Sequence, residues 1–191
     1  MTPDPVPLEG TCHCGALAVR LMTARALAEL PVRVCGCGFC RRHRPRYTSD
    51  PGGRLEIRLA AEDSASRYRF GLGLADFLVC RTCGVFVAAV EPGPPCRAVL
   101  NLDVLDRADE LTAAPTRFED YDREDVAARS ARRARAWTPA VVVVGGAVSS
   151  SARSSTSRLS TARHGGPGST AAANTPHVRH TRKSASPSPK R

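Results

Sequence analysis

The chain has 191 residues, enough for one domain of ordinary size and an additional segment, and it carries a formal net charge of +10 and eight cysteines. The charge is uneven, because residues 1–140 contain all 18 acidic residues and 20 arginines, whereas residues 141–191 contain eight basic residues and no acid. The nearly balanced first part and an aromatic content of 5% argue against a nucleic-acid-binding domain, and no run approaches the roughly 20 apolar residues of a membrane helix.

Short alternating segments dominate the first hundred residues and predict β-strands. The clearest is RLEIRLA at 54–60, where Leu55, Ile57 and Leu59 share one face and charged residues share the other. Strands with one polar face are typical of antiparallel sheets. The predicted strands are 16–22, 30–35, 54–60, 66–71, 76–80, 85–90 and 97–102.

Helix signals appear only late in the chain. Residues 101–111 predict a short turn, and residues 121–137 predict a helix, because acids at its start and arginines at its end suit the helix dipole. Pro139 is expected to end this helix, so we expect one mainly β domain over residues 6–140. Residues 141–191, rich in Ser, Arg and Pro, are expected to form a disordered basic tail with at most weak contacts to nucleic acid.

The cysteines are expected to bind metal rather than to form disulfides. The amino terminus lacks the basic start and apolar core of a secretory signal, which predicts a cytoplasmic location, where thiols stay reduced. Cys12 and Cys14 are two positions apart at the start of a predicted strand, so their side chains share one face. Cys80 and Cys83 form a Cys-x-x-Cys knuckle, and these four thiolates together predict a closed, structural zinc site.

Cys35, Cys37 and Cys40 form a third cluster on one tight loop. A zinc ion with three protein ligands keeps a fourth position for water or substrate, which is a catalytic arrangement. The spacing leaves other partitions open, such as one in which the clusters that begin at Cys12 and at Cys35 share a zinc and Cys40 joins the Cys80–Cys83 knuckle. Cys96 lies in a proline-rich turn and is expected to be a free thiol, and neither His13 nor His43 is expected to be a ligand.

Four stretches in this order, GTCHCGAL, CGCGFCRR, YRFG and FLVCRTCGVFV, resemble the glutathione-dependent formaldehyde-activating enzyme family, which includes centromere protein V. The resemblance covers roughly residues 8–112. It implies coiled, mostly antiparallel β-sheets with two zinc ions per chain. It also implies that Cys12, Cys14, Cys80 and Cys83 are structural, and that Cys35, Cys37 and Cys40 hold an exchangeable, catalytic zinc.

The resemblance implies a carbon–sulfur lyase-type enzyme that acts on adducts of a small-molecule thiol and an aldehyde, such as S-hydroxymethylglutathione formed from formaldehyde. Three thiolates around Zn²⁺ leave a net charge of about −1, which weakens its Lewis acidity and favours binding of the substrate sulfur. Arg41 and Arg42 follow the third cluster, and we expect them to bind the carboxylates of the thiol.

The competing hypothesis is a non-catalytic zinc-binding module whose basic tail contacts an acidic partner. Zinc ribbons use similar knuckles. In that case both zinc ions would be structural, and the cluster at residues 35–40 would have no open position.

Overall fold

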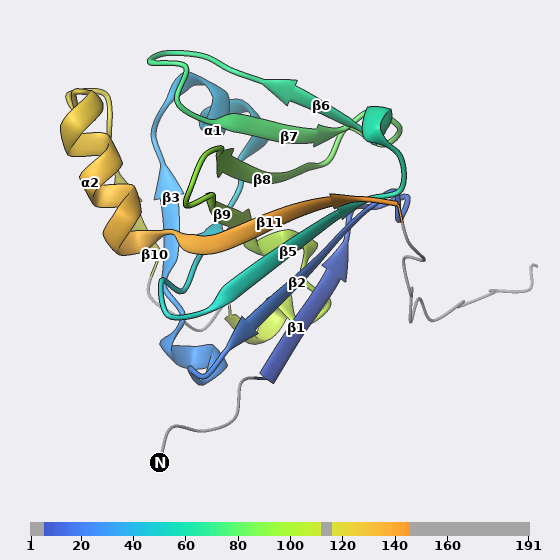
Figure 1. The fold of residues 1–191 in the computed structure, drawn as a ribbon. Helices are drawn as coiled ribbons and strands as arrows, with labels where there is room; N and C mark the ends of the chain where they lie inside the picture. The colour runs from blue at the N-terminus through green and yellow to red at the C-terminus, as the bar shows by residue number, and fades with distance from the viewer. Residues whose placement is uncertain (1–5, 112–115, 146–191) are drawn as a thin grey trace, which may run out of the picture. The chain divides into compact units, whose positions relative to one another are not determined.

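The computed structural model describes residues 6–111 and 116–145 and shows a mainly β fold with two α-helices in these ranges (Figure 1). The strands are β1 (Val6–Thr11), β2 (Leu17–Thr23), β3 (Val32–Cys35), β4 (Tyr47–Thr48), β5 (Arg54–Leu59), β6 (Ala65–Tyr68), β7 (Asp76–Cys80), β8 (Phe86–Glu91), β9 (Arg97–Asn101), β10 (Thr116–Glu119) and β11 (Thr138–Val144). The helices are α1 (Gly38–His43) and α2 (Val126–Ala136), and short 3₁₀ turns lie at Leu27–Glu29, Glu62–Ser64, Leu102–Val104 and Ala108–Leu111.

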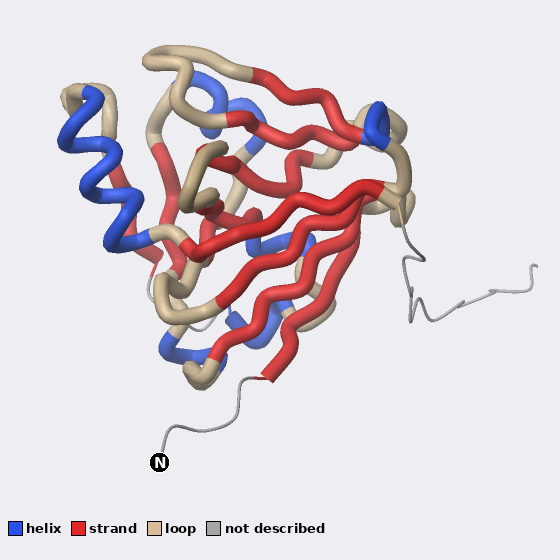
Figure 2. Tube along the Cα trace, in the orientation of Figure 1, coloured by secondary structure: helices blue, strands red, loops and turns tan. Residues whose placement is uncertain are grey.

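The strands form one mixed sheet in the order β1-β2-β5-β11-β9-β4-β3-β10, from which β8, β7 and β6 branch at β9. The expected antiparallel arrangement holds for most neighbouring strands, but β11 runs parallel to β5 and β10 runs parallel to β3. Figure 2 shows β1, β2, β5 and β11 side by side. Alternating patterns could not reveal the parallel pairs, because each joins segments that are far apart in the chain.

All seven predicted strands are present, and their ends differ from the expected ones by at most three residues. Four further strands, β1, β4, β10 and β11, were not predicted, since they are short, interrupted by Pro and Gly, or apolar throughout. Strand β11 crosses the expected boundary at 140, and its residues 140–144 pair with β5. The folded part therefore continues to Val144, and the tail predicted to be disordered lies outside the described residues from 146 onward.

The late helix is confirmed, but it begins at Val126 rather than near residue 121. Asp125 caps it, because its side chain accepts a hydrogen bond from the backbone N–H of Ala128 at 2.8 Å. The helix ends before Trp137, and Pro139 lies in β11 rather than at the helix end. The turn expected at 101–111 is present as two 3₁₀ turns. No helix within the described ranges is long and apolar enough to cross a bilayer.

Two groups of buried side chains form the interior. The larger group contains Leu55, Ile57 and Leu59, each 0% exposed, which confirms the inward face predicted for β5. It also contains Cys12 and Cys80. The smaller group joins aromatic side chains from several elements to Cys40, with Cys35 and Cys37 packed against it; its buried members are Cys40, Tyr47, Ala75, Phe86, Ala89, Val99 and Trp137. Each cysteine-rich region thus rests on its own part of the core.

Candidate functional site

The first cysteine group brings together the two outer clusters of the sequence. Cys12 and Cys14 lie in the turn that follows β1, while Cys80 ends β7 and Cys83 lies in the turn before β8. All four Sγ atoms are within 4.8 Å of one another. The sulfur of Cys14 is 3.6 Å from that of Cys12 and 3.5 Å from that of Cys80. Gly84, with a φ of 73°, makes the turn that folds the knuckle back.

The donor set and spacing of this group fit a tetrahedral zinc ion. Zn–S bonds of about 2.3 Å place neighbouring sulfur atoms about 3.8 Å apart, close to the two sulfur–sulfur distances in this group. Burial raises the pKa of the Cys12 thiol to about 12. At Cys83 burial also raises the pKa, but hydrogen bonds from backbone N–H groups and from the side chains of Cys80 and Cys14 together outweigh it and lower the pKa to about 6. Four sulfur ligands complete the coordination of a tetrahedral ion, so this group can hold a metal without an open position.

The second cysteine group consists of Cys35, Cys37 and Cys40 and lies where β3 leads into α1. Cys35 ends β3, Cys37 precedes the first residue of α1, and Cys40 lies inside the helix. Their Sγ atoms are within 4.8 Å of one another, and within the described ranges no further Cys, His, Asp or Glu completes the group. The sequence predicts a loop here, whereas the structure has a short helix. The Cys37 sulfur caps this helix, because it accepts a hydrogen bond from the backbone N–H of Cys40 at 3.5 Å. This group can hold a metal with one position left free.

Hydrogen bonds distinguish the three thiols of the second group. The hydrogen bond from Cys40 lowers the pKa of Cys35 to about 6, and the same contact together with burial raises the pKa of Cys40. The hydroxyl of Tyr47 lies 3.0 Å from the Cys40 sulfur, and burial raises the pKa of this hydroxyl. Tyr47, on the two-residue strand β4, was not identified from the sequence.

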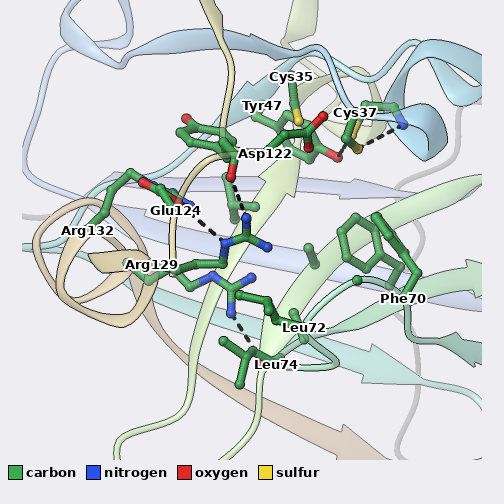
Figure 3. Close-up of a pocket in the computed structure, with 18 of the residues that line it drawn as sticks. Cys35, Cys37, Tyr47, Phe70, Leu72, Leu74, Asp122, Glu124, Arg129 and Arg132 are labelled. Carbon is green, nitrogen blue, oxygen red and sulfur yellow. Dashed lines mark hydrogen bonds and ion pairs between the residues drawn. The ribbon is translucent and has the colours of Figure 1, made fainter. Parts of the chain in front are cut away.

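The second group opens onto a cavity of about 390 Å³ (Figure 3). Cys35, Cys37 and Cys40 line one side of it together with Tyr47. Figure 3 shows two further regions, one of charged side chains from α2 and the segment before it, and one of apolar side chains from the loop between β6 and β7. The charged residues are Asp122, Glu124, Arg129, Arg132 and Arg133, to which β3 adds Arg33, and the apolar ones include Phe70, Leu72 and Leu74, to which β7 adds Phe77.

The arginines that line the cavity are not those expected from the sequence. Arg41 and Arg42 are exposed on α1 and do not line it, and one Nη of Arg42 donates to the carbonyl of Gly38 at 2.7 Å. Both precede Arg44, the left-handed residue that ends α1. The cationic lining comes instead from β3 and α2.

One sequence signal could have indicated the α2 arginines. Arg129, Arg132 and Arg133 follow the i, i+3, i+4 spacing, which places all three on one face of a helix. The spacing could not show that this face points at the cysteines. Cys96, His13 and His43 belong to neither group of possible metal ligands.

Comparisons with known proteins add little to this geometry. No family model matches the chain. The fold is similar to the crystal structure of a Rhodobacter sphaeroides protein determined as a Northeast Structural Genomics target, with 26% sequence identity over 58% of this chain and 99% of that one. The TM-score is 0.47, and we derive no function from it.

Proposed function

We propose that the protein is a zinc-dependent carbon–sulfur lyase-type enzyme, which forms or cleaves adducts between a thiol and an aldehyde such as formaldehyde. The observation that supports the proposal is the position of three thiols, Cys35, Cys37 and Cys40, on the wall of a cavity of about 390 Å³. A second, four-thiol group elsewhere would serve to hold the fold together, which leaves the three-thiol group for a substrate.

Sulfur ligands in a tetrahedral arrangement favour zinc among the common divalent ions. Cys12, Cys14, Cys80 and Cys83 would hold a structural zinc, and Cys35, Cys37 and Cys40 would hold a second one. When bound there, zinc would take the substrate sulfur as a thiolate and lower its pKa. Three cysteine thiolates leave the centre with a charge of about −1, which makes polarisation of a carbonyl the weaker role.

The chemistry that the cavity must accommodate is simple and balanced. The thiol loses its proton, its sulfur bonds to the carbonyl carbon, the π electrons of the carbonyl move to oxygen, and the oxygen takes up a proton. The reverse reaction breaks the same carbon–sulfur bond and returns both reactants. No oxidant or reductant is needed in either direction.

The side chains around the cavity have separate tasks in this proposal. Tyr47 is a positioning residue, because its hydroxyl lies 3.0 Å from the Cys40 sulfur and can donate a hydrogen bond to this sulfur when Cys40 is a thiolate. Phe77 and Trp137 line the cavity beside the thiols and exclude water. The arginines of β3 and α2 attract an anionic substrate toward the thiols.

Exchange of formaldehyde between free and thiol-bound forms, followed by NMR with glutathione and other small thiols, tests the proposal. We expect the protein to accelerate exchange with at least one thiol, and Cys37→Ser to remove the acceleration while a Cys96→Ser control retains it. If the intact zinc-loaded protein leaves exchange at its uncatalysed rate with every thiol, the enzyme proposal fails and a purely structural zinc module is favoured.

A further inference from the structure

We propose that Arg129, together with Arg33, binds a carboxylate of the substrate, so that the substrate class is carboxylate-bearing thiols with an apolar body. The inference rests on the proposed function for the sulfur end of the substrate. The anion site itself depends only on the side chains that line the cavity.

The Nε of Arg129 is a buried donor that forms no hydrogen bond. Both oxygens of Glu124 accept hydrogen bonds from Arg132, at 2.7 and 2.9 Å. The Nε of Arg129 lies 3.4 Å from the same carboxylate, and this buried nitrogen forms no hydrogen bond. One Nη of Arg129 donates to the carbonyl of Tyr121. Arg132 thus makes both hydrogen bonds to Glu124, and the Nε of Arg129 has only its 3.4 Å contact with this carboxylate.

Two further arginines of the cavity, Arg33 and Arg133, also have incomplete sets of partners. Arg33 donates to the hydroxyl of Ser49, and in the described ranges no carboxylate forms an ion pair with it. The side chain of Arg133 is 7% exposed and donates to Glu91 at 3.0 Å, but its Nε is buried without a partner. Burial lowers the pKa of both guanidinium groups, which stay protonated at neutral pH because their reference pKa is so high.

The charges on the cavity wall favour an anion. Four guanidinium groups line the cavity, whereas the lining carboxylates are those of Glu124 and Asp122, of which Asp122 is exposed. Glu91 lies outside the lining and pairs with Arg133. A carboxylate is the anion whose two oxygens match the paired donors of a guanidinium group. Such a carboxylate would pair with the guanidinium groups that line the cavity.

The rest of the lining defines the body of this ligand. Phe70, Leu72 and Leu74 come from the loop between β6 and β7 and form an apolar region of the cavity. Leu72 is 43% exposed, so part of this apolar region is accessible to a ligand. The cavity therefore offers thiols for a sulfur, guanidinium groups for a carboxylate, and an apolar surface for the carbon frame between them.

The test uses the full-length protein with cobalt in place of zinc, whose absorption reports thiol binding. The probes are 2-mercapto-3-phenylpropionate and its methyl ester, which differ in the charge of the carboxyl group and in one methyl group. We expect the acid to bind at least tenfold more tightly than the ester. Arg129→Met should weaken binding of the acid at least tenfold and leave binding of the ester unchanged. Arg129→Lys should restore part of the preference for the acid, because lysine supplies a point charge. Arg123→Met is the matched control, because Arg123 is exposed on the same segment and does not line the cavity.

Equal affinity of the intact protein for acid and ester would overturn the inference, as would a preference that survives Arg129→Met. If Arg129→Met does not fold, as judged by cobalt content and melting temperature, Arg33→Met replaces it with the same expected and contrary outcomes. A structural role alone would lower stability in Arg129→Met without changing the ratio of acid to ester affinity.

A third probe, 3-phenylpropionate, has the carboxylate but no sulfur, and its binding is measured by calorimetry. If thiols leave the cobalt spectrum unchanged while 3-phenylpropionate binds in an Arg129-dependent way, the anion site stands and the proposed function fails. If both thiols change the spectrum equally and 3-phenylpropionate does not bind, the proposed function stands and the anion site fails.

Discussion

The hydroxyl of Tyr47 and the sulfur of Cys40 are 3.0 Å apart within the smaller core, where their residues are 6% and 3% exposed. Tyr47 comes from β4 and Cys40 from α1, so this contact ties the helix that carries Cys40 to the sheet. A hydroxyl that donates to a thiolate reduces its charge and fixes its orientation, as outer-shell partners do in metal sites. The metal affinity of the three-thiol group should therefore depend on Tyr47.

We predict that Tyr47→Phe weakens metal binding at the three-cysteine group about 10- to 100-fold, because the outer hydrogen bond is lost while the ring is retained. Stability should fall by only about 1 kcal/mol. Competition with a chelator measures the affinity. Tyr68→Phe is the control, since Tyr68 is 50% exposed and its contacts are with aromatic rings. Equal metal affinity in Tyr47→Phe and the intact protein would show that the contact has no role at the metal.

The two cysteine groups should respond differently to the loss of one thiol. We expect about two zinc ions per chain in the intact protein and about one in Cys37→Ser, which should stay folded because the smaller core remains packed. Cys83→Ser should unfold the domain, because its group anchors the larger core. Zinc analysis and circular dichroism make the comparison, with Cys96→Ser as a control outside both groups. Unfolding of Cys37→Ser to the same extent as Cys83→Ser would contradict an open, exchangeable site.

Gly10, two residues before Cys12, is required by a close approach of two backbone segments. A Cβ atom there would lie 1.9 Å from the carbonyl oxygen of Val104 and 2.6 Å from Cα of Leu105. We predict that Gly10→Ala destabilises the protein by about 2–3 kcal/mol, because the backbone has to shift. Denaturant unfolding measures the change. Gly52→Ala is the control, with its nearest atom at 3.6 Å, and should stay within about 0.5 kcal/mol of the unaltered protein.

The ion pair between Glu124 and Arg132 should make part of the stability pH-dependent. Hydrogen bonds from Arg132 lower the pKa of Glu124 in the folded state. A lowered pKa stabilises the fold above the ordinary carboxyl value of about 4.3, and this contribution is lost as the pH falls through the folded value. The difference in unfolding free energy between the intact protein and Glu124→Gln should therefore shrink as the pH falls from 7 to 3.

The same measurement with Arg132→Met as the background supplies the control. Most of the pH dependence should disappear there, since the largest cause of the lowered pKa is removed. If the difference in unfolding free energy between the intact protein and Glu124→Gln stays constant from pH 7 to pH 3, the ion pair does not stabilise the fold.

The strands could be predicted from the sequence because their pattern is local. Leu55, Ile57 and Leu59 alternate with charged residues, and burial of that one face requires a strand whatever its neighbours are. Strand β11 shows the limit of this reasoning. Its valines carry no alternation, and its place between β5 and β9 depends on pairings with residues more than 30 positions away.

The division of the cysteines into a group of four and a group of three could also be predicted from the sequence. Pairs two or three residues apart have to lie close together, and a metal accepts only a few sulfur ligands, so few partitions are possible. The structure selects one of them by bringing the turn after β1 to the end of β7.

The arginines show what the sequence could not decide. Arg41 and Arg42 are next to Cys40 in the chain, yet the short helix α1 turns them to the surface. Arg33 and Arg129 are distant from one another in the chain and line one cavity. The sequence by itself determined the strands, the late helix and the grouping of the thiols, because these follow from spacings of a few residues. The tertiary structure alone decided which charges face the thiols, since that depends on contacts between segments whose separation in the chain carries no local signal.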